Sequence, residues 1–151
     1  AEHTGYWLTD ADSMEMAFGG LNITARDYAK LGELYRLGGA FNGQQIVPAD
    51  WVSASIVADA PHLIPGDNPA SDWPLGYGYQ WWTNDDGSFS AQGIFGQGIY
   101  IDPKRNLVIA SNSNWPRATH FETVGVQREN FYRAVQAAVD AEQGQRRQLD
   151  E

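Results

Sequence analysis

The side chains that could act as acids, bases or metal ligands are spread along the chain, and their spacing builds none of the common sites. His3, His62 and His120 lack the i,i+4 spacing that brings two imidazoles onto one metal ion, so we expect solvated histidines and no metal site. Asp85-Asp86 stands in a turn signal, which favours a solvated hairpin tip over an acid–base pair. The sequence has no cysteine, which excludes a thiol nucleophile, a disulfide and Cys-ligated zinc.

Motifs that bind phosphate or carry a nucleophilic serine are also missing from the 151 residues. The glycine-rich stretch Gly93–Gly98 lies between two predicted strands, without the following helix that a phosphate loop requires. No serine stands in a G-x-S-x-G elbow. These residues therefore predict no cofactor and contain no recognisable nucleophile of their own.

The composition argues against nucleic acid or a membrane as a partner. With 19 acidic and 10 basic residues the net charge is −9, and the largest basic cluster is Arg146-Arg147, which suits neither a phosphate backbone nor an anionic bilayer. No run approaches the roughly 20 apolar residues of a membrane span, and the first residues lack the pattern of a signal peptide. Four of the six tryptophans lie between Trp73 and Trp115, which predicts a packed sheet or an aromatic-walled pocket.

The elements that must position any site begin with helices. Apolar residues recur at helical spacing over residues 24–37, opened by a capping box with Asp as its acid and closed by two glycines. Asn42-Gly43 predicts a tight turn, and Pro48 opens a second, short helix. Residues 59–76 hold four of the seven prolines and predict a long irregular loop.

The second half of the chain changes to the alternating pattern of strands. We expect an antiparallel meander with strands at 77–82, 88–94, 98–102 and 107–112. Thr119 and Glu122 match a capping box before a last helix that ends near Asp140, and residues 141–151 are expected to be a polar, disordered tail. The predicted fold class is α+β, a meander packed with helices, in one unit over residues 1–140.

Several sequence blocks follow one another in a recognisable order. They are Gly19–Gly32, Asn42-Gly43, Pro48–Trp51, Gly76–Trp82, Gly93–Gln97 and Ile101–Pro103. In this order they resemble the C-terminal part of the class C β-lactamase-like serine hydrolases of the penicillin-recognising superfamily. The resemblance is strongest to the branch of 6-aminohexanoate-dimer hydrolases and esterases.

The resemblance implies an enzyme of which this chain is the latter part. In that family a serine in S-x-x-K attacks an ester or amide carbonyl, while the lysine and a downstream tyrosine handle protons. No serine of this chain stands in S-x-x-K, so we expect the nucleophile and the tyrosine upstream of Ala1, in a missing N-terminal part. The chain begins without Met, as expected of a processed or excised piece, and alone it is expected to be inactive.

The resemblance also assigns a candidate site. The Lys-Thr-Gly element of the family matches Ala91, Gln92 and Gly93, which we expect to bind substrate, and the main-chain N–H of the following Ile94 is the expected oxyanion donor. Ala91 replaces the lysine, which removes the cation for a β-lactam or peptide carboxylate and disfavours those two substrates. Gly93 would let substrate approach the strand, although it could equally relieve crowding in a twisted sheet.

Trp81 and Trp82 are the remaining candidate substrate contacts. Because successive side chains of a strand point to opposite faces, one of them should face the core and the other the pocket or solvent. Core packing of both would be the simpler interpretation.

Three functions fit these observations. The first is a serine hydrolase of small amides or esters, whose partner is the missing N-terminal part of its own chain. The second is a stand-alone module whose aromatic sheet binds a sugar or peptide, and the third is a catalytically inactive scaffold, which the loss of lysine at Ala91 would also fit. In the first case the isolated chain should self-associate, because an apolar sheet face is left uncovered.

Overall fold

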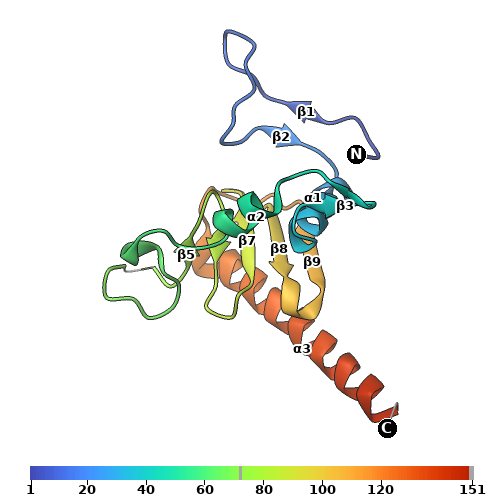
Figure 1. Ribbon diagram of the computed structural model, residues 1–151. Helices are drawn as coiled ribbons and strands as arrows, with labels where there is room; N and C mark the ends of the chain where they lie inside the picture. Colours follow the sequence, from blue (N-terminus) through green and yellow to red (C-terminus); the bar gives the residue numbers. More distant parts are fainter. Residues whose placement is uncertain (72, 150–151) are drawn as a thin grey trace.

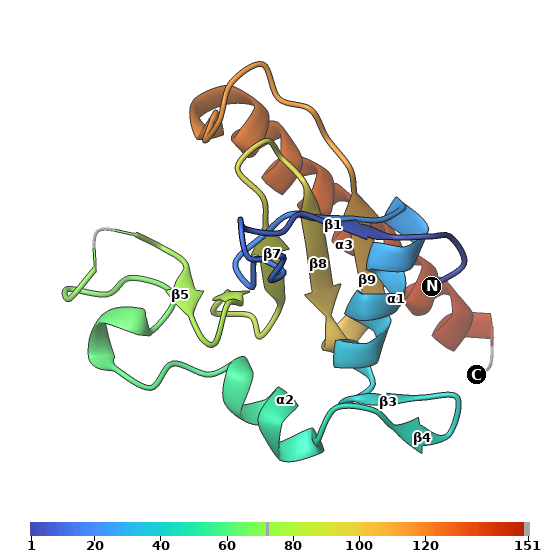
Figure 2. The same ribbon diagram turned by 90° about the horizontal axis from the view of Figure 1, so that it is seen from above.

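A five-stranded antiparallel sheet forms the centre of the molecule in a computed structural model that describes residues 1–71 and 73–149 (Figure 1). Its strands follow one another in chain order: β5 (Gly76–Tyr77), β6 (Trp82–Thr83), β7 (Phe89–Gln92), β8 (Gly98–Asp102) and β9 (Leu107–Ser111). Helix α1 (Ala25–Arg36) covers one face and α3 (Val126–Leu149) the other, as Figure 2 shows from above. The predicted α+β class and the antiparallel meander are confirmed.

The alternation of side chains along β8 explains why both faces need a helix. Ile99 and Ile101 face α1 and join Trp81 and Phe89 in the buried core, where all four side chains are at most 6% exposed. Tyr100 faces α3 instead and stacks on Tyr132, with 4.5 Å between the ring centroids. Burial of an apolar side chain of this size contributes about 1.5–3 kcal/mol, so the first face supplies most of the apolar stabilisation of the sheet.

Helix α1 begins and ends where its sequence predicts. Oγ1 of Thr24 accepts the N–H of Asp27 at 3.1 Å, and the Asp27 carboxylate accepts the N–H of Glu2 at 2.7 Å. That bond from Glu2 is the main reason why the pKa of Asp27 falls to about 2. Gly38 and Gly39, both at positive φ, end the helix.

The middle of the chain also matches its local signals. Asn42 and Gly43, at φ 50° and 76°, form the turn between β3 (Ala40–Phe41) and β4 (Gln44–Gln45). Pro48 precedes α2 (Ala49–Ser55), and the described residues of the proline-rich segment contain only the short 3₁₀ helix η1 (Pro61–Leu63) before β5 begins at Gly76.

The predicted strand 77–82 is wrong, because this segment is a tight hairpin. Tyr77 of β5 pairs with Trp82 of β6, and the N–H of Gly78 donates to the C=O of Trp81 at 2.9 Å. Gln80 adopts φ 66°, and the C=O of Ser55 accepts the N–H of Tyr79 at 2.8 Å. The bend therefore depends on contact with the end of α2, which the alternating pattern does not record.

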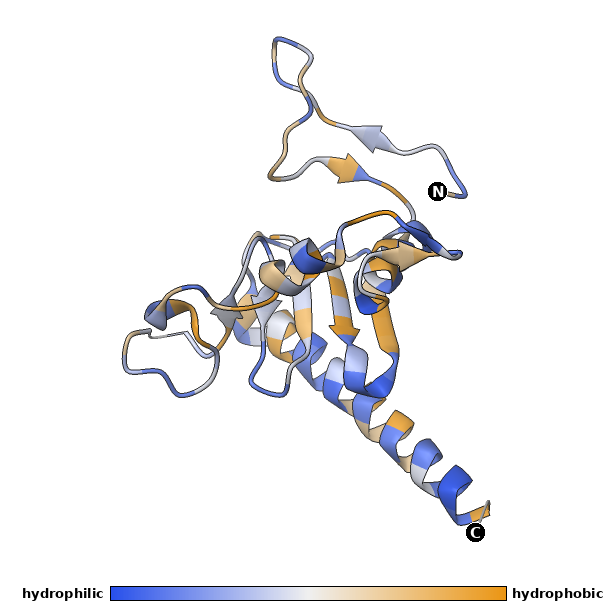
Figure 3. Ribbon diagram, viewed as in Figure 1, coloured by the Kyte–Doolittle hydropathy of each residue, from blue (hydrophilic) through white to orange (hydrophobic). Residues whose placement is uncertain are grey.

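Helix α3 starts later and ends later than predicted. Thr119 does not cap it, since it lies at φ 52° before a π-helical turn, η3 (Phe121–Gly125), that leads into the helix. Residues 141–149, expected to be a polar tail, continue the helix, and residues 150 and 151 lie outside the described part. Glu142 and Arg146 form an i,i+4 ion pair of 2.6 Å that favours this extension, which is mostly hydrophilic in Figure 3. Among the described residues no helix is long and apolar enough to cross a membrane.

An N-terminal hairpin, not predicted from the sequence, stands away from the sheet in Figure 1. It pairs β1 (Tyr6–Trp7) with β2 (Leu21–Asn22). Its exposed apolar side chains are Tyr6 (71%), Trp7 (47%), Leu8 (56%), Met14 (66%) and Phe18 (83%). The expected uncovered sheet face is not found, because α1 and α3 pack on the two faces of the sheet. The apolar surface that the described chain leaves uncovered is on this hairpin instead.

Candidate active site

The candidate oxyanion donor lies in a hairpin turn at the end of β7. The N–H of Gly93 donates to the C=O of Gln97 at 2.8 Å, and the N–H of Gly96 donates to the C=O of Gly93 at 3.0 Å. Gly96 lies at φ 87°, as in the common three-residue hairpin loop that ends in a left-handed glycine. Strand β7 thus ends at Gln92, and Ile94 stands in the turn, not in the strand as predicted.

Ile94 presents a main-chain donor that the fold does not use. The residue is 57% exposed, and its N–H has no hydrogen-bond partner among the described residues. Its C=O does have one, because the N–H of Thr119 donates to it at 2.7 Å. The hydrogen bond from Thr119 therefore holds Ile94 through its C=O, while the N–H of Ile94 stays free for a ligand.

The strand edge beside this turn is open. Ala91 and Gly93 exchange hydrogen bonds with the β8 side, so the N–H and C=O of Gln92 between them point the other way. On that side β6 pairs with Phe89 and Ser90 of β7 and does not extend as far as Gln92. The edge at Gln92 can therefore pair with an extended ligand that places a carbonyl near Ile94.

Trp115, which was not among the predicted site residues, contacts the turn at Phe95 and Gly96. The N–H of Trp115 donates to the C=O of Phe95 at 3.0 Å. A Cβ on Gly96 would lie 2.1 Å from Nε1 of Trp115, so only glycine allows this contact. Phe121 continues the aromatic row, 5.7 Å from Trp115 and 6.2 Å from Trp73 between ring centroids.

The two adjacent tryptophans of the candidate site have different surroundings. Trp81 is 6% exposed and packs on Tyr35 and Phe89, with ring centroids 4.6 Å and 5.2 Å away, so it belongs to the core. Trp82 is half-buried on the other face, 6.4 Å from Trp73. The expectation of one core-facing side chain is met, and of this pair only Trp82 is placed to meet a ligand.

An apolar cavity of about 330 Å³ opens beside Trp82. Leu63, Leu75, Trp73, Tyr77 and His62 contribute to its lining. Most of these residues come from the proline-rich segment 59–76, for which the sequence predicts an irregular loop. The tryptophan and the leucines of this segment are the only sequence features that indicate a cavity wall, because its residue pattern predicts no helix or strand.

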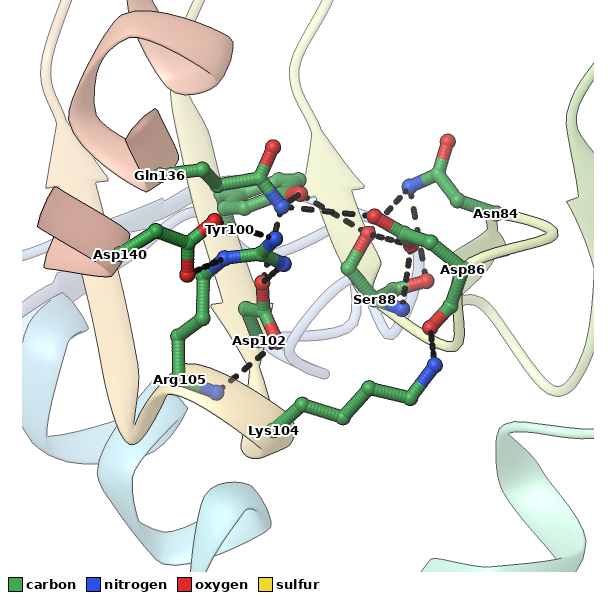
Figure 4. Close-up of polar contacts among 9 residues, drawn as sticks. All are labelled: Asn84, Asp86, Ser88, Tyr100, Asp102, Lys104, Arg105, Gln136 and Asp140. Atoms are coloured by element: carbon green, nitrogen blue, oxygen red, sulfur yellow. Dashed lines mark hydrogen bonds and ion pairs between the residues drawn. The ribbon is translucent and has the colours of Figure 1, made fainter. Parts of the chain in front are cut away.

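A polar network at the opposite end of the sheet joins α3 to the β6–β7 turn and to β8 (Figure 4). The Tyr100 hydroxyl donates to Ser88 at 2.8 Å, and Nε2 of Gln136 donates to Tyr100 and Asp102, both at 2.8 Å. Burial is the main cause that raises the pKa of Tyr100 to about 12. These groups satisfy one another, so the network stabilises the fold and offers no free acid or base.

Among the described residues, no group of three or more His, Asp and Glu side chains is arranged to hold a metal ion. Asp85 and Asp86 lie at the tip of the β6–β7 hairpin, as predicted, but only Asp85 is exposed, whereas Asp86 is half-buried and bonded to Ser88 and Gln136. Hydrogen bonds from Ser88 and Gln136 outweigh burial and keep the pKa of Asp86 below its ordinary value.

Comparison with known proteins agrees with the resemblance stated above. The family model described as Beta-lactamase matches residues 2–129. The 6-aminohexanoate-dimer hydrolase of Paenarthrobacter ureafaciens is 34% identical over 110 residues, which are 71% of this chain and 28% of that protein. A solved structure named "Putative 6-aminohexanoate-dimer hydrolase from Bacillus anthracis" aligns with a TM-score of 0.72 and 29% identity, over 91% of this chain and 34% of that one.

The chain therefore spans about a third or less of the length of these two relatives. The matched residues include all five strands of the sheet and α1, and they end in the first turn of α3. On these grounds the chain belongs to the β-lactamase family of hydrolases.

Proposed function

We propose that this chain forms one wall of the active site of a serine hydrolase that cleaves small amides or esters through an acyl-enzyme. The observation that carries the proposal is the free, exposed N–H of Ile94 at the end of the open edge of β7. An amide at this place can stabilise the oxyanion of a tetrahedral intermediate, a contribution of about 2.7–4 kcal/mol per donor. Ala91, Gln92 and Gly93 would align the substrate along the same edge.

The nucleophile of this reaction has to come from outside the chain. The proposal places the S-x-x-K serine and the tyrosine on an upstream segment of a longer protein, which would lie against this edge. The lengths of the relatives support it, since the chain spans 28% and 34% of them. The 151 residues alone are then expected to be inactive, because they contain no S-x-x-K serine.

The substrate is proposed to be a small linear amide or ester whose carboxylate, where it has one, is not bound at position 91. Ala91 stands where the family has lysine, so position 91 itself offers no cation for a carboxylate. The cavity beside Trp82 is apolar and would accept a hydrocarbon segment. The two relatives are named for hydrolysis of the 6-aminohexanoate dimer, so linear amides of this kind and their ester analogues are the first substrates to test.

The oxyanion role of Ile94 is tested by a substitution that removes its main-chain N–H. Ile94 occupies the second position of the turn, where proline is well accepted, and no internal bond uses its N–H. In the full-length protein, Ile94→Pro should lower kcat for a nitrophenyl ester by about 10²–10³ while the thermal midpoint changes little. Ile94→Val, which keeps the N–H, is the matched control. Equal kcat for the two variants would refute the oxyanion role.

The two alternatives predict different outcomes. The apolar cavity with Trp73 and Trp82 favours a binding module for a sugar or peptide as the second candidate. A serine-directed phosphonate separates the candidates: covalent labelling of the full-length protein upstream of Ala1 supports the enzyme. Absence of labelling with retained ligand binding supports the module, and absence of both supports an inactive scaffold.

A further inference from the structure

Arg128, in the first turn of α3, is a buried cation next to the hairpin turn of the candidate site. Its side chain is 8% exposed, and its Cζ lies 5.2 Å from the centroid of the Trp115 ring. Nη2 donates to Oε1 of Gln92 at 2.8 Å. The nearest carboxylate, of Glu129, is 3.3 Å from the same nitrogen and is itself 41% exposed. The guanidinium thus makes specific contacts in addition to a surface ion pair.

These contacts reach both sides of the turn that holds Ile94. Gln92 is the last residue of β7 and directly precedes Gly93, where the turn begins. Trp115 holds the far side, through its hydrogen bond to Phe95. One planar group, placed over an aromatic ring and bonded to an amide, therefore connects Gln92, which precedes the turn, with Trp115, which bonds Phe95 within it.

Burial of the Arg128 guanidinium costs desolvation free energy, which an apolar side chain packed at the same place would not lose. Its Nη1 is buried and has no hydrogen-bond partner among the described residues. Buried donors are nearly always paired, so an unpaired one marks a position that is held for another reason. A hydrophobic side chain could fill this site without that cost.

We propose that Arg128 is a positioning residue that fixes the turn 93–97, and with it the direction of the Ile94 N–H. The inference rests on the proposed function for its catalytic consequence, but the positioning itself is a property of the fold. Arg128 acts through Gln92 and Trp115, and does not touch substrate. Since catalytic donors act only when aligned, a small displacement of the turn lowers kcat more than it changes KM.

The test compares Arg128→Met with Arg146→Met in the full-length protein. Arg146 is on the same helix but is 74% exposed, and among the described residues it bonds only to Glu142, so its removal controls for the loss of one charge. In Arg128→Met we expect hydrogen exchange at the N–H groups of Gly96 and Trp115 to rise by about tenfold. We also expect kcat to fall by about 10- to 100-fold with KM within threefold of wild type. Arg128→Lys, which keeps the charge but not the planar fork, should restore only part of kcat.

Three results would overturn the proposal. They are unchanged exchange at the turn, a rise in KM alone, and full recovery of kcat in Arg128→Lys. If Arg128→Met does not fold, Gln92→Met removes the same hydrogen bond and leaves the charge, and the same acceleration of exchange is expected at Gly96. If the wild-type protein is inactive, the proposed function fails, while the exchange measurements still support or overturn the positioning role.

Discussion

At the scale of single residues, glycine decides whether the candidate site can form. Gly96 combines a positive φ of 87° with direct contact to Trp115, whose Nε1 would lie 2.1 Å from a Cβ. Gly43 also has a positive φ, 76°, in the β3–β4 turn, but nothing lies within 4 Å of a Cβ built there. The two positions therefore separate backbone strain from steric overlap.

We expect Gly43→Ala to lower the free energy of unfolding by about 1–2 kcal/mol, the cost of a left-handed alanine. Gly96→Ala should lower it by that amount plus about 1–3 kcal/mol, because the ring of Trp115 must move. Urea unfolding of both variants measures the difference. Because Trp115 holds Phe95, the Gly96 variant should also reduce kcat of the full-length protein, whereas the Gly43 variant should not. Equal losses of stability would show that overlap at Gly96 is relieved without cost.

At the scale of elements, the bounds of α1 and β8 could be predicted from the sequence because their signals are local. Thr24 and the two glycines mark the ends of α1, and the turn after Asp102 marks the end of β8. The hairpin at Tyr77–Trp82 could not be predicted in the same way. Its bend is set by a hydrogen bond to Ser55, more than twenty residues earlier, and strand alternation carries no trace of it.

The candidate site likewise combines residues that the sequence indicates with residues that only tertiary contacts bring together. Ile94 could be predicted as a candidate donor from the order of sequence blocks, and its N–H has no hydrogen-bond partner among the described residues. Trp115 and Arg128 could not be assigned, because they reach the turn from 20 or more residues away through tertiary contacts. Helical periodicity predicts that α3 is a helix, but it does not indicate which of its basic side chains is buried.

Packing of α1 on the sheet gives the prediction at this scale. A Cβ on Gly32 would lie 2.6 Å from Val108 and 2.8 Å from Ile99, so the helix approaches the sheet closely at this residue. Gly144 is also helical, but nothing lies within 4 Å of its Cβ position. Alanine at Gly144 should raise the free energy of unfolding by up to about 1 kcal/mol through helix propensity.

Alanine at Gly32 should do the opposite, because overpacking costs about 1–3 kcal/mol and exceeds the gain in propensity. Urea denaturation of the two variants, with unchanged m-values, measures both signs. A stabilised Gly32→Ala variant would mean that α1 can move outward from the sheet, and would contradict the close packing described above.

At the scale of the whole molecule, charge and apolar surface act in opposite directions on association. The net charge of −9 favours separation of copies, and the effect weakens as salt screens it. The hairpin of β1 and β2 favours association, because it exposes several large apolar side chains on one projecting segment. Edge strand β9, with Leu107, Val108 and Ile109, adds an unpaired strand edge in the described chain.

We therefore expect the isolated chain to self-associate, and increasingly so as the salt concentration rises. Sedimentation velocity over a range of protein concentrations measures the effect. Replacing Leu8 and Phe18 by serine should shift the chain toward monomer, because these side chains are 56% and 83% exposed on the hairpin. Val57→Ser, at 55% exposure outside the hairpin, is the control and should change little. A wild-type chain that stays monomeric at high concentration and high salt would show that the hairpin surface does not drive association. The need for an upstream segment to cover that surface would then lose its physical basis.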